Sequence, residues 1–486
     1  MLIRPLSALF SLVGFCSTVS AAPAVVPLSL SLELCPAAPL AAVPLDFCGL
    51  SYETRLLLPA ADGSHYFDAD QTELIAAFRQ LGIKSLRIGG NTAEREGVPV
   101  PNEADIDALF AFARAADTKV IYTLRMDHNT PTEAARIARY IDLHYADHLQ
   151  AFIVGNEPNK GGRTYAAYYG TWQRFATAIN AGEAVPRAVY CAPTTTDGGP
   201  EWSARMATDE AGHHRVAMIG QHYYPGGGSP QFNDRPATAR TDLMSLAWHH
   251  RYQKLHDRFV PAVRALGLGF RLNETNSFHT GGVHDASDTF AATLWGLDYL
   301  YWWAQHGALG LNFHSGQKVY PGDDVVRQNV YTPLTMNADG ATVLPLGYAI
   351  KAFNLVAPGN QLRAVKLRST GHVPRSGFVA YATVTPDGAT TYLTLINGTF
   401  GDAGVSYRLN LPSAQADTVA RLDLLAPAGD PSAATGLTLG DAAITPPGTW
   451  SGTWTTPSPG EAIEVAPASA TLIRLSRPTP PPPAGG

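Results

Sequence analysis

The chain has 486 residues, of which 45% are hydrophobic and 16% are charged, so it is long enough to bury one large core and a second, smaller one. Its formal net charge is -6, and no long acidic or basic run occurs. This balance argues against a nucleic-acid partner, because phosphates require clustered Lys and Arg.

The chain begins with the three-part pattern of a secretory signal, over residues 1–22. Arg4 precedes an apolar run at residues 6–15, which small residues follow. That run is shorter than the roughly 20 apolar residues that a membrane helix needs, and no other stretch approaches that length. We expect cleavage near Ala21 or Ala22, export to the periplasm or the medium, and no membrane association afterwards.

Three cysteines remain after such cleavage: Cys35, Cys48 and Cys191. Either Cys35 and Cys48 form a bridge, or all three are small buried side chains. Neither the cysteines nor the histidines are spaced as in a zinc site, so we expect no metal. The sequence Asn397-Gly398-Thr399 is the expected acceptor if the chain is glycosylated.

From residue 45 onward, short apolar runs alternate with longer segments of helical period, which predicts a parallel α/β fold. Eight such units within residues 45–358 predict a (β/α)8 TIM barrel. The strands are expected at residues 45–52, 84–90, 118–124, 150–155, 188–194, 216–223, 268–274 and 308–315. The expected helices include residues 69–81, 133–145, 165–181, 242–266, 287–306 and 346–355.

A second domain is expected over residues 359–477, where short alternating segments are separated by Gly, Pro and Asp turns. This pattern predicts a C-terminal antiparallel β-sandwich. The N-terminal segment, residues 23–44, alternates Val, Leu and Ser and is expected to join the sandwich. The Pro-rich tail, residues 478–486, is expected to be extended and to lie outside both domains.

Two glutamates directly follow predicted barrel strands. Glu157 follows the fourth strand within Asn156-Glu157-Pro158, and Glu274 ends the seventh. The active site of such a barrel lies at the carboxyl ends of its strands, where an unpaired carboxylate leaving an apolar strand is costly. Each glutamate alone could cap the next helix, but together they predict a catalytic pair.

Cleavage of a glycosidic bond with retention uses such a pair, since one carboxyl protonates the leaving oxygen and the other attacks the anomeric carbon. We therefore predict a retaining glycoside hydrolase with Glu157 as the acid/base and Glu274 as the nucleophile. Repulsion from ionised Glu274 is expected to raise the pKa of Glu157 and keep it protonated until the leaving oxygen needs the proton.

Other residues at predicted strand ends are expected in the same cavity. His222 and Tyr224 share one face of an extended strand; Tyr224 is expected to donate to the nucleophile, and His222 to line the sugar site or to be a core histidine. Arg87 either orients a catalytic carboxylate or braces the barrel floor. Glu53 accepts from sugar hydroxyls, or forms an ion pair with Arg55 or Arg87. The aromatic side chains expected around the mouth are Trp202, Tyr223, Phe278 and Tyr320.

With these residues identified, the chain resembles glycoside hydrolase family 79 of clan A, which includes β-glucuronidases, 4-O-methyl-glucuronidases and heparanase. The resemblance covers essentially the whole mature chain. It implies a retaining enzyme, a β-linked glucuronic acid as substrate, and no cofactor. It also implies that Asn156 holds the sugar 2-hydroxyl and that Glu53 contacts the sugar. Its motifs are Gly155-Asn156-Glu157-Pro158-Asn159, Gln221-His222-Tyr223-Tyr224, Asn273-Glu274-Thr275-Asn276-Ser277, Gly281-Gly282 and Ser287 to Asp298.

The same resemblance implies how the uronate carboxylate is bound. The sequence Thr280-Gly281-Gly282 matches a glycine-rich loop whose backbone N–H groups receive that carboxylate, as backbone nests bind anions. His279 stands where the family has a tyrosine, and could donate to the same carboxylate. Tyr320 is expected near Gly281, at the end of the pocket. The expected partner is an oligosaccharide or glycoconjugate that contains glucuronic acid.

Three other functions stay open. A heparanase-like endo enzyme is less favoured than exo action, because the chain lacks the paired basic clusters that densely anionic heparan sulfate requires. A clan A β-glycosidase that acts on a neutral sugar is the second alternative. The third is a secreted carbohydrate-binding protein, although binding alone has no need of a proton donor.

Overall fold

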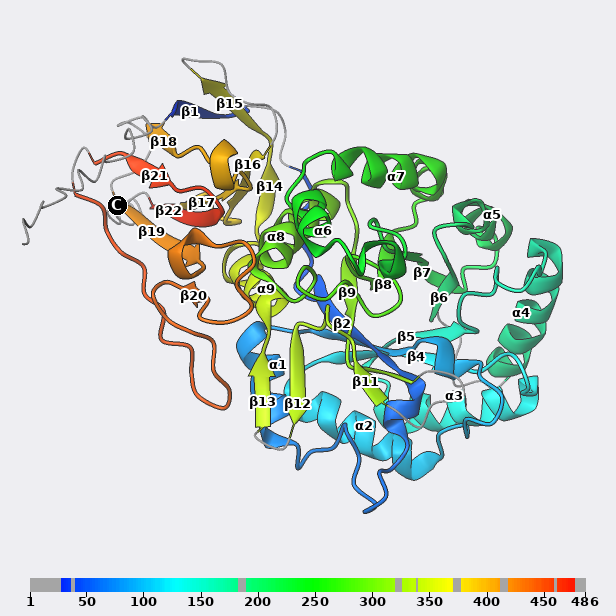
Figure 1. Cartoon of the computed structure of the whole chain (residues 1–486). Helices are drawn as coiled ribbons and strands as arrows, with labels where there is room; N and C mark the ends of the chain where they lie inside the picture. Colours follow the sequence, from blue (N-terminus) through cyan, green and yellow to red (C-terminus); the bar gives the residue numbers. More distant parts are fainter. Residues whose placement is uncertain are drawn as a thin grey trace, which may run out of the picture.

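The structure is a computed structural model, which describes residues 28–35, 40–181, 189–319, 326–337, 340–369, 377–410, 418–458 and 461–476. A closed barrel of eight parallel strands lies beside two stacked sheets (Figure 1). The predicted TIM barrel followed by a C-terminal β-sandwich is therefore confirmed. The expected signal at residues 1–22, the tail at 478–486 and Tyr320 lie outside the described residues. In the part of the chain that is described, no helix combines the length and the apolar character of a bilayer span.

The barrel strands overlap the eight segments in which strands were expected. Their side chains are almost all buried, because a parallel barrel is covered by helices on its outside and filled by side chains within. Fully buried Arg271 holds the amino end of the barrel together: its guanidinium donates to Asn312 Oδ1 at 2.6 Å and to the Asp46 carbonyl at 2.8 Å. The strands are β2 (Cys48–Glu53), β3 (Ser85–Gly89), β4 (Lys119–Leu124), β5 (Leu149–Val154), β6 (Tyr190–Thr195), β7 (Val216–Tyr223), β8 (Phe270–Thr275) and β9 (Gly310–His314).

The helices between these strands differ from expectation at one place. The single helix expected at residues 242–266 is wrong, because α6 ends at Leu243 and α7 begins at Trp248. Between them Ser245 Oγ accepts the Ala247 N–H at 3.2 Å, a local bond that competes with helical hydrogen bonding. The helices are α1 (Thr72–Leu81), α2 (Glu103–Ala116), α3 (Pro131–Tyr145), α4 (Tyr165–Asn180), α5 (Pro200–Glu210), α6 (Pro236–Leu243), α7 (Trp248–Ala265), α8 (Phe290–Gln305) and α9 (Pro345–Val356).

The sandwich consists of a four-stranded sheet, β15-β1-β18-β21, and a six-stranded sheet, β14-β16-β17-β22-β19-β20. The N-terminal strand β1 (Leu28–Leu34) pairs with β15 and β18, far away in the sequence (Figure 1). Its Leu30 and Leu32 pack into a core with Leu393 and Leu395 of the other sheet. The remaining strands are β14 (Gln361–Arg363), β15 (Val365–Ser369), β16 (Phe378–Val384), β17 (Thr390–Asn397), β18 (Tyr407–Asn410), β19 (Thr418–Leu425), β20 (Thr438–Leu439), β21 (Ile463–Val465) and β22 (Ser469–Ser476), with the hairpins β10 (Gln317–Val319)/β11 (Val326–Gln328) and β12 (Leu334–Asn337)/β13 (Gly340–Val343) on the barrel side.

Helix α8 joins the two domains. All but its last residue are buried, as expected for a helix that is apolar on every side. Tyr301 contacts Thr394 of β17 at 2.8 Å between hydroxyl oxygens, and Tyr381 of β16 donates to Asp298 at 2.6 Å. The sandwich is thus packed directly against the barrel helix that follows the Glu274 strand.

The structure decides two points of covalent chemistry that the sequence left open. Cys35, Cys48 and Cys191 are all free, so Cys35 and Cys48 form no bridge. Cys48 and Cys191 are buried, and burial raises the pKa of both thiols. Asn397 is also fully buried and donates to the carbonyls of Val405 and Ala466, both at 2.8 Å. A glycan has no access to that side chain.

Candidate active site

A pocket of about 350 Å³ opens where the barrel strands end. It is lined by most of the side chains singled out in the sequence: Glu53, Glu157, His222, Tyr224, Glu274, His279, Thr280 and Gly281. Arg87 and Asn156 are buried in contact with this group. Tyr320 lies outside the described residues.

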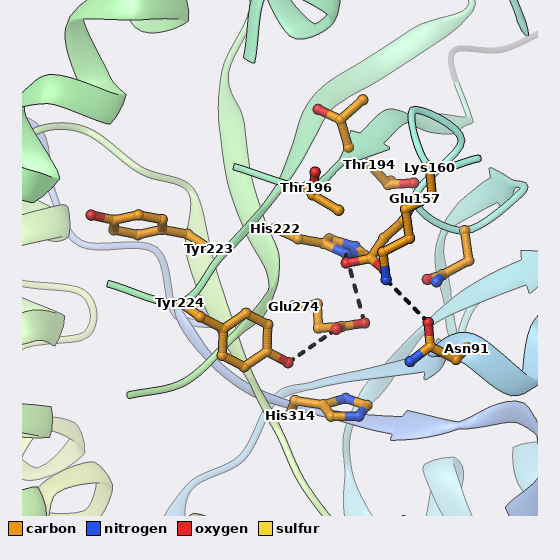
Figure 2. A network of polar contacts seen from close by, with 12 residues as sticks. Asn91, Glu157, Lys160, Thr194, Thr196, His222, Tyr223, Tyr224, Glu274 and His314 are labelled. Carbon is orange, nitrogen blue, oxygen red and sulfur yellow. Dashed lines mark hydrogen bonds and ion pairs between the residues drawn. The ribbon is translucent and has the colours of Figure 1, made fainter. Parts of the chain in front are cut away.

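The turn after β5 places Glu157 in the pocket. Gly155 has a φ of 84° and Glu157 a φ of 48°, a left-handed conformation that costs energy in a residue with a side chain. Its carboxyl group is almost fully buried: Oε1 lies 3.1 Å from His222 Nδ1, and Oε2 contacts the ammonium of Lys160. Figure 2 shows these groups together.

Glu274 occupies the end of β8 across the pocket from Glu157. Its Oε2 lies 2.6 Å from Arg87 Nη1, and its Oε1 accepts from the Tyr224 hydroxyl at 3.0 Å (Figure 2). His222 Nδ1 is 3.7 Å from Glu274 Oε2. This carboxylate therefore contacts three side chains, Arg87 from β3, His222 from β7 and Tyr224 directly after β7.

His222 is not a core histidine but lies between the two glutamates. Its Nε2 is 3.2 Å from the Asn273 side-chain amide nitrogen, and its Nδ1 faces Glu157. With a proton on Nδ1 the ring donates to Glu157 Oε1, whether the ring is neutral or charged. His222 thus holds one oxygen of Glu157 in place.

Arg87 orients a carboxylate and does not brace the barrel floor. Its fully buried guanidinium contacts Glu274, the side-chain oxygen of Asn156 and, at 3.1 Å, Ser51 Oγ. The floor is held instead by Arg271. With its oxygen on Arg87, the Asn156 amide keeps its NH₂ end as a donor.

The pKa of Glu157 is shifted in the direction opposite to the expected one. Burial alone would raise the pKa of Glu274, but the charges of His222, His314 and Arg87 hold it well below its usual range. Burial and the charge of Glu274 also raise the pKa of Glu157. The hydrogen bond from His222 and the charge of His222, together with the smaller effect of the Lys160 charge, outweigh them, so the pKa of Glu157 is lowered. The expected net rise is wrong for this arrangement of the site.

Glu53 is the last residue of β2 and also lines the pocket. Its Oε2 accepts the Thr92 N–H at 2.8 Å and the Thr92 hydroxyl at 2.5 Å, and His314 Nε2 lies 3.7 Å from Oε1. Neither Arg55 nor Arg87 pairs with it among the described contacts. The turn after β3 needs a glycine at position 90. Gly90 has a φ of 70°, and a Cβ atom added there would lie 2.5 Å from the Glu53 carboxyl group.

The loop after β8 has three successive residues in the left-handed region: Thr280 (φ 69°), Gly281 (φ 91°) and Gly282 (φ 89°). Thr280 and Gly281 line the pocket. Within the described residues no acceptor contacts the backbone N–H of Thr280 or Gly281, and successive N–H groups in such a turn can bind an anion. His279 Nδ1 lies 2.9 Å from Thr280 Oγ1, beside the same loop.

The expectation for the aromatic side chains was wrong in part. Tyr223 lines the pocket. Trp202 instead packs on Tyr168 at 5.6 Å between ring centroids, and fully buried Phe278 packs on Trp248 at the same centroid distance. Both lie in the layer behind the pocket wall, because an apolar ring next to a strand end is as useful to the core as to a ligand.

Three acidic or basic residues that line the pocket were not expected from the sequence: Lys160, Asp197 and His314. His314 ends β9 and contacts Ser51 at 3.2 Å as well as Glu53. The strand-end rule that identified Glu274 would have found it too. Lys160 comes three residues after Glu157 in a turn, and neither its period nor its composition distinguishes it from a surface lysine.

Among the residues that the structure describes, one group of ligand-type atoms could hold a metal ion: oxygens of Glu157 and Glu274 and a ring nitrogen of His222, all within 4.8 Å of one another. Arg87 and Lys160 already supply positive charge to both carboxylates. Both carboxylates of this group are therefore already matched to cations of the protein.

We expect Arg87→Met to reduce the free energy of unfolding at pH 7 by about 3–5 kcal/mol, since it removes the guanidinium that pairs with the buried Glu274 carboxylate. Because His222, His314 and Arg87 together hold the pKa of Glu274 low, the part contributed by Arg87 is present above the ordinary carboxyl pKa of about 4.3 and is lost as the pH falls. Urea unfolding of both proteins at several pH values measures the difference.

The control is the double variant Arg87→Met/Glu274→Gln, which also removes the uncompensated charge and should recover part of the lost stability. Equal stability of wild type and Arg87→Met at pH 7 would show that the pair contributes nothing.

No family model matches the chain, and no curated protein matches it. Among solved structures, it is similar to a 4-O-α-L-rhamnosyl-β-D-glucuronidase from Fusarium oxysporum 12S in complex with Rha-GlcA, with 19% identity and a TM-score of 0.70 over 92% of this chain and 100% of that one. A GH51 arabinofuranosidase from Xanthomonas axonopodis pv. citri has 14% identity and a TM-score of 0.65 over the same shares. A GH30 endoxylanase from Clostridium papyrosolvens C71 has 14% identity and a TM-score of 0.53, again over 92% and 100%. The chain thus shares the fold of these glycoside hydrolases.

Proposed function

We propose that this barrel is a retaining glycoside hydrolase in which Glu157 is the acid/base and Glu274 the nucleophile. The separation of the two carboxyl groups carries the proposal, since one oxygen of each lies within 4.8 Å of the other. Retaining glycosidases have carboxyl groups about 5–5.5 Å apart, whereas inverting enzymes need about 6.5–9.5 Å to admit a water. The observed spacing suits direct attack by Glu274.

The contacts of each glutamate suit one step of this reaction. Glu274, kept ionised by Arg87, attacks the anomeric carbon, while Glu157 gives its proton to the glycosidic oxygen as the C–O bond breaks. The products are a glycosyl ester of Glu274 and a free alcohol. Glu157, now a carboxylate, takes a proton from water; the resulting hydroxide attacks the anomeric carbon and releases Glu274.

We further propose that the sugar is a terminal β-linked glucuronic acid, or its 4-O-methyl derivative. Three features support an anionic sugar: the N–H groups of Thr280 and Gly281, His279 beside them, and Lys160, which lines the same pocket. The name of the Fusarium structure, a β-D-glucuronidase with bound Rha-GlcA, agrees with this choice. Membership of glycoside hydrolase family 79 and secretion through residues 1–22 belong to the same proposal.

A single assay tests the proposal. An aryl β-glucuronide and the matching aryl β-glucoside are hydrolysed in parallel while proton NMR follows the first-formed sugar. We expect turnover of the glucuronide with at least about 100-fold preference, an energy difference that charged hydrogen bonds readily supply. The first product should be the β-anomer.

Each alternative has its own outcome in this experiment. Hydrolysis of the glucoside alone would assign the enzyme to a neutral sugar, and α-anomer as the first product would refute retention. Cleavage only inside longer glucuronate-containing chains would favour endo action. Binding without turnover of any glycoside would leave a carbohydrate-binding protein.

A further inference from the structure

Lys160 is fixed beside Glu157 by the backbone turn that they share. The Lys160 N–H donates to the Glu157 carbonyl at 3.0 Å, which brings the lysine side chain back over the carboxyl group. Its ammonium contacts Glu157 Oε2 and lies 3.3 Å from Asn91 Oδ1 (Figure 2). The lysine side chain is 56% exposed, whereas that of Glu157 is 8% exposed.

The two oxygens of Glu157 therefore have different partners. Oε1 faces His222, which is 1% exposed and bonded to Asn273 on its other side, so this contact is held rigidly. Oε2 is the oxygen left to protonate a leaving group, but Lys160 occupies it. An ammonium has three donors and no acceptor. A protonated Oε2 can reach the glycosidic oxygen only after Lys160 has moved away.

Lys160 is also the charged neighbour of Glu157 that is free to move. The other charged and titratable groups facing this carboxyl come from several elements: His222 from β7, Tyr224 after β7, Glu274 from β8, Asp197 after β6 and, through Glu274, Arg87 from β3. Of the cations among these, His222 and Arg87 are buried and bonded to other side chains. The exposed, flexible stem of Lys160 lets its ammonium follow a new anion.

We propose that Lys160 is a specificity-determining residue, which leaves Glu157 and pairs with the carboxylate of an anionic sugar when that sugar binds. This rests on the proposed function and deepens it. A uronate draws the ammonium from Oε2, so Glu157 takes one proton from solvent and can give it to the glycosidic oxygen. A neutral sugar leaves the Lys160–Glu157 pair intact and the acid ionised. Selectivity for uronides then arises in proton donation as well as in binding.

The pH dependence has a definite sign. Burial, His222 and Lys160 act on the pKa of Glu157 in this structure, and the charge of Lys160 lowers it. The protonated acid is the active form, so kcat/KM, which reports the free enzyme, falls at a lower pH than kcat, which reports the complex. For an aryl β-glucuronide we expect the basic limb of kcat to lie at least about 1 pH unit above that of kcat/KM.

The test compares Lys160→Met with wild type on the glucuronide, with Lys160→Arg as the conservative variant and Lys254→Met, on the exposed face of α7, as the matched control. We expect Lys160→Met to move the basic limb of kcat/KM to higher pH. The pH difference between the basic limbs of kcat and kcat/KM should fall to less than half of its wild-type value. The preference for glucuronide over glucoside should fall about 10-fold or more. Lys160→Arg should restore most of the gap, and Lys254→Met should behave as wild type.

Two results would overturn the inference: coincident limbs in the wild type, or a gap that Lys160→Met leaves unchanged. A loss of kcat at every pH with the gap preserved would also overturn it, because a merely structural lysine would act in that way. Failure of the proposed function looks different, since the wild type would then not hydrolyse the glucuronide at all.

Discussion

Glu274→Gln should reduce kcat by about 10⁴-fold or more on every glycoside that the wild type hydrolyses, because an amide cannot form the glycosyl ester and removal of a nucleophile disables the catalytic unit as a whole. The change preserves the size of the side chain and keeps an oxygen for Arg87, while the new NH₂ group faces the Tyr224 hydroxyl, which can accept from it. Steady-state kinetics on aryl β-glucuronides with good and poor leaving groups measure the loss, which should be of similar size for both.

A second measurement tests directly for the glycosyl ester of Glu274. A 2-deoxy-2-fluoro-glucuronide with a good leaving group should add one glycosyl unit to the wild type, located at Glu274 by peptide mass spectrometry, and nothing to Glu274→Gln. The control is Glu201→Gln, the same chemical change at an exposed ion pair on α5. Labelling of another carboxylate, or retained turnover in Glu274→Gln, would show that the nucleophile is elsewhere.

Glu157→Ala should have an effect that depends on the leaving group. On substrates with alkyl or sugar leaving groups we expect a loss of about 10²–10⁴-fold, the usual contribution of a positioned general acid. Aryl leaving groups of low pKa depart without protonation, so for them the first step should change little. A plot of log kcat/KM against leaving-group pKa should therefore be much steeper for the variant than for the wild type.

The second step gives an internal control for the same variant. Azide needs no general base, so it should restore turnover of activated substrates by Glu157→Ala and form a β-glycosyl azide. Azide should not change the wild-type rate in this way. An equal loss for all leaving groups, with no response to azide, would contradict the acid/base role.

Much of the fold could be predicted because it depends on local patterns. Alternating apolar runs and helical periods identified the barrel strands within a few residues, from β2 to β9. The strand-end rule then placed Glu157 and Glu274 in one pocket although 117 positions separate them in the sequence. The break between α6 and α7 was missed because it covers only residues 244–247, which include no Gly or Pro to mark it.

The electrostatics of the site could not be predicted in the same way. The sequence suggested a raised pKa for Glu157 because it showed one neighbouring charge, that of Glu274. The structure adds the hydrogen bond from His222, which is 65 positions away, and the ammonium of Lys160. Their sum reverses the direction of the shift. A buried charge responds to every group within a few ångströms, whatever its place in the chain.

The sequence by itself thus determined the barrel, the sandwich that follows it and the pair of glutamates at two strand ends, since periodicity and strand position are properties of short segments. Only the tertiary structure decided which partner holds each carboxylate: Arg87 and Tyr224 for Glu274, His222 and Lys160 for Glu157. These partners come from strands and turns that meet only when the barrel closes. The protonation of the acid is therefore set by distances that closure creates.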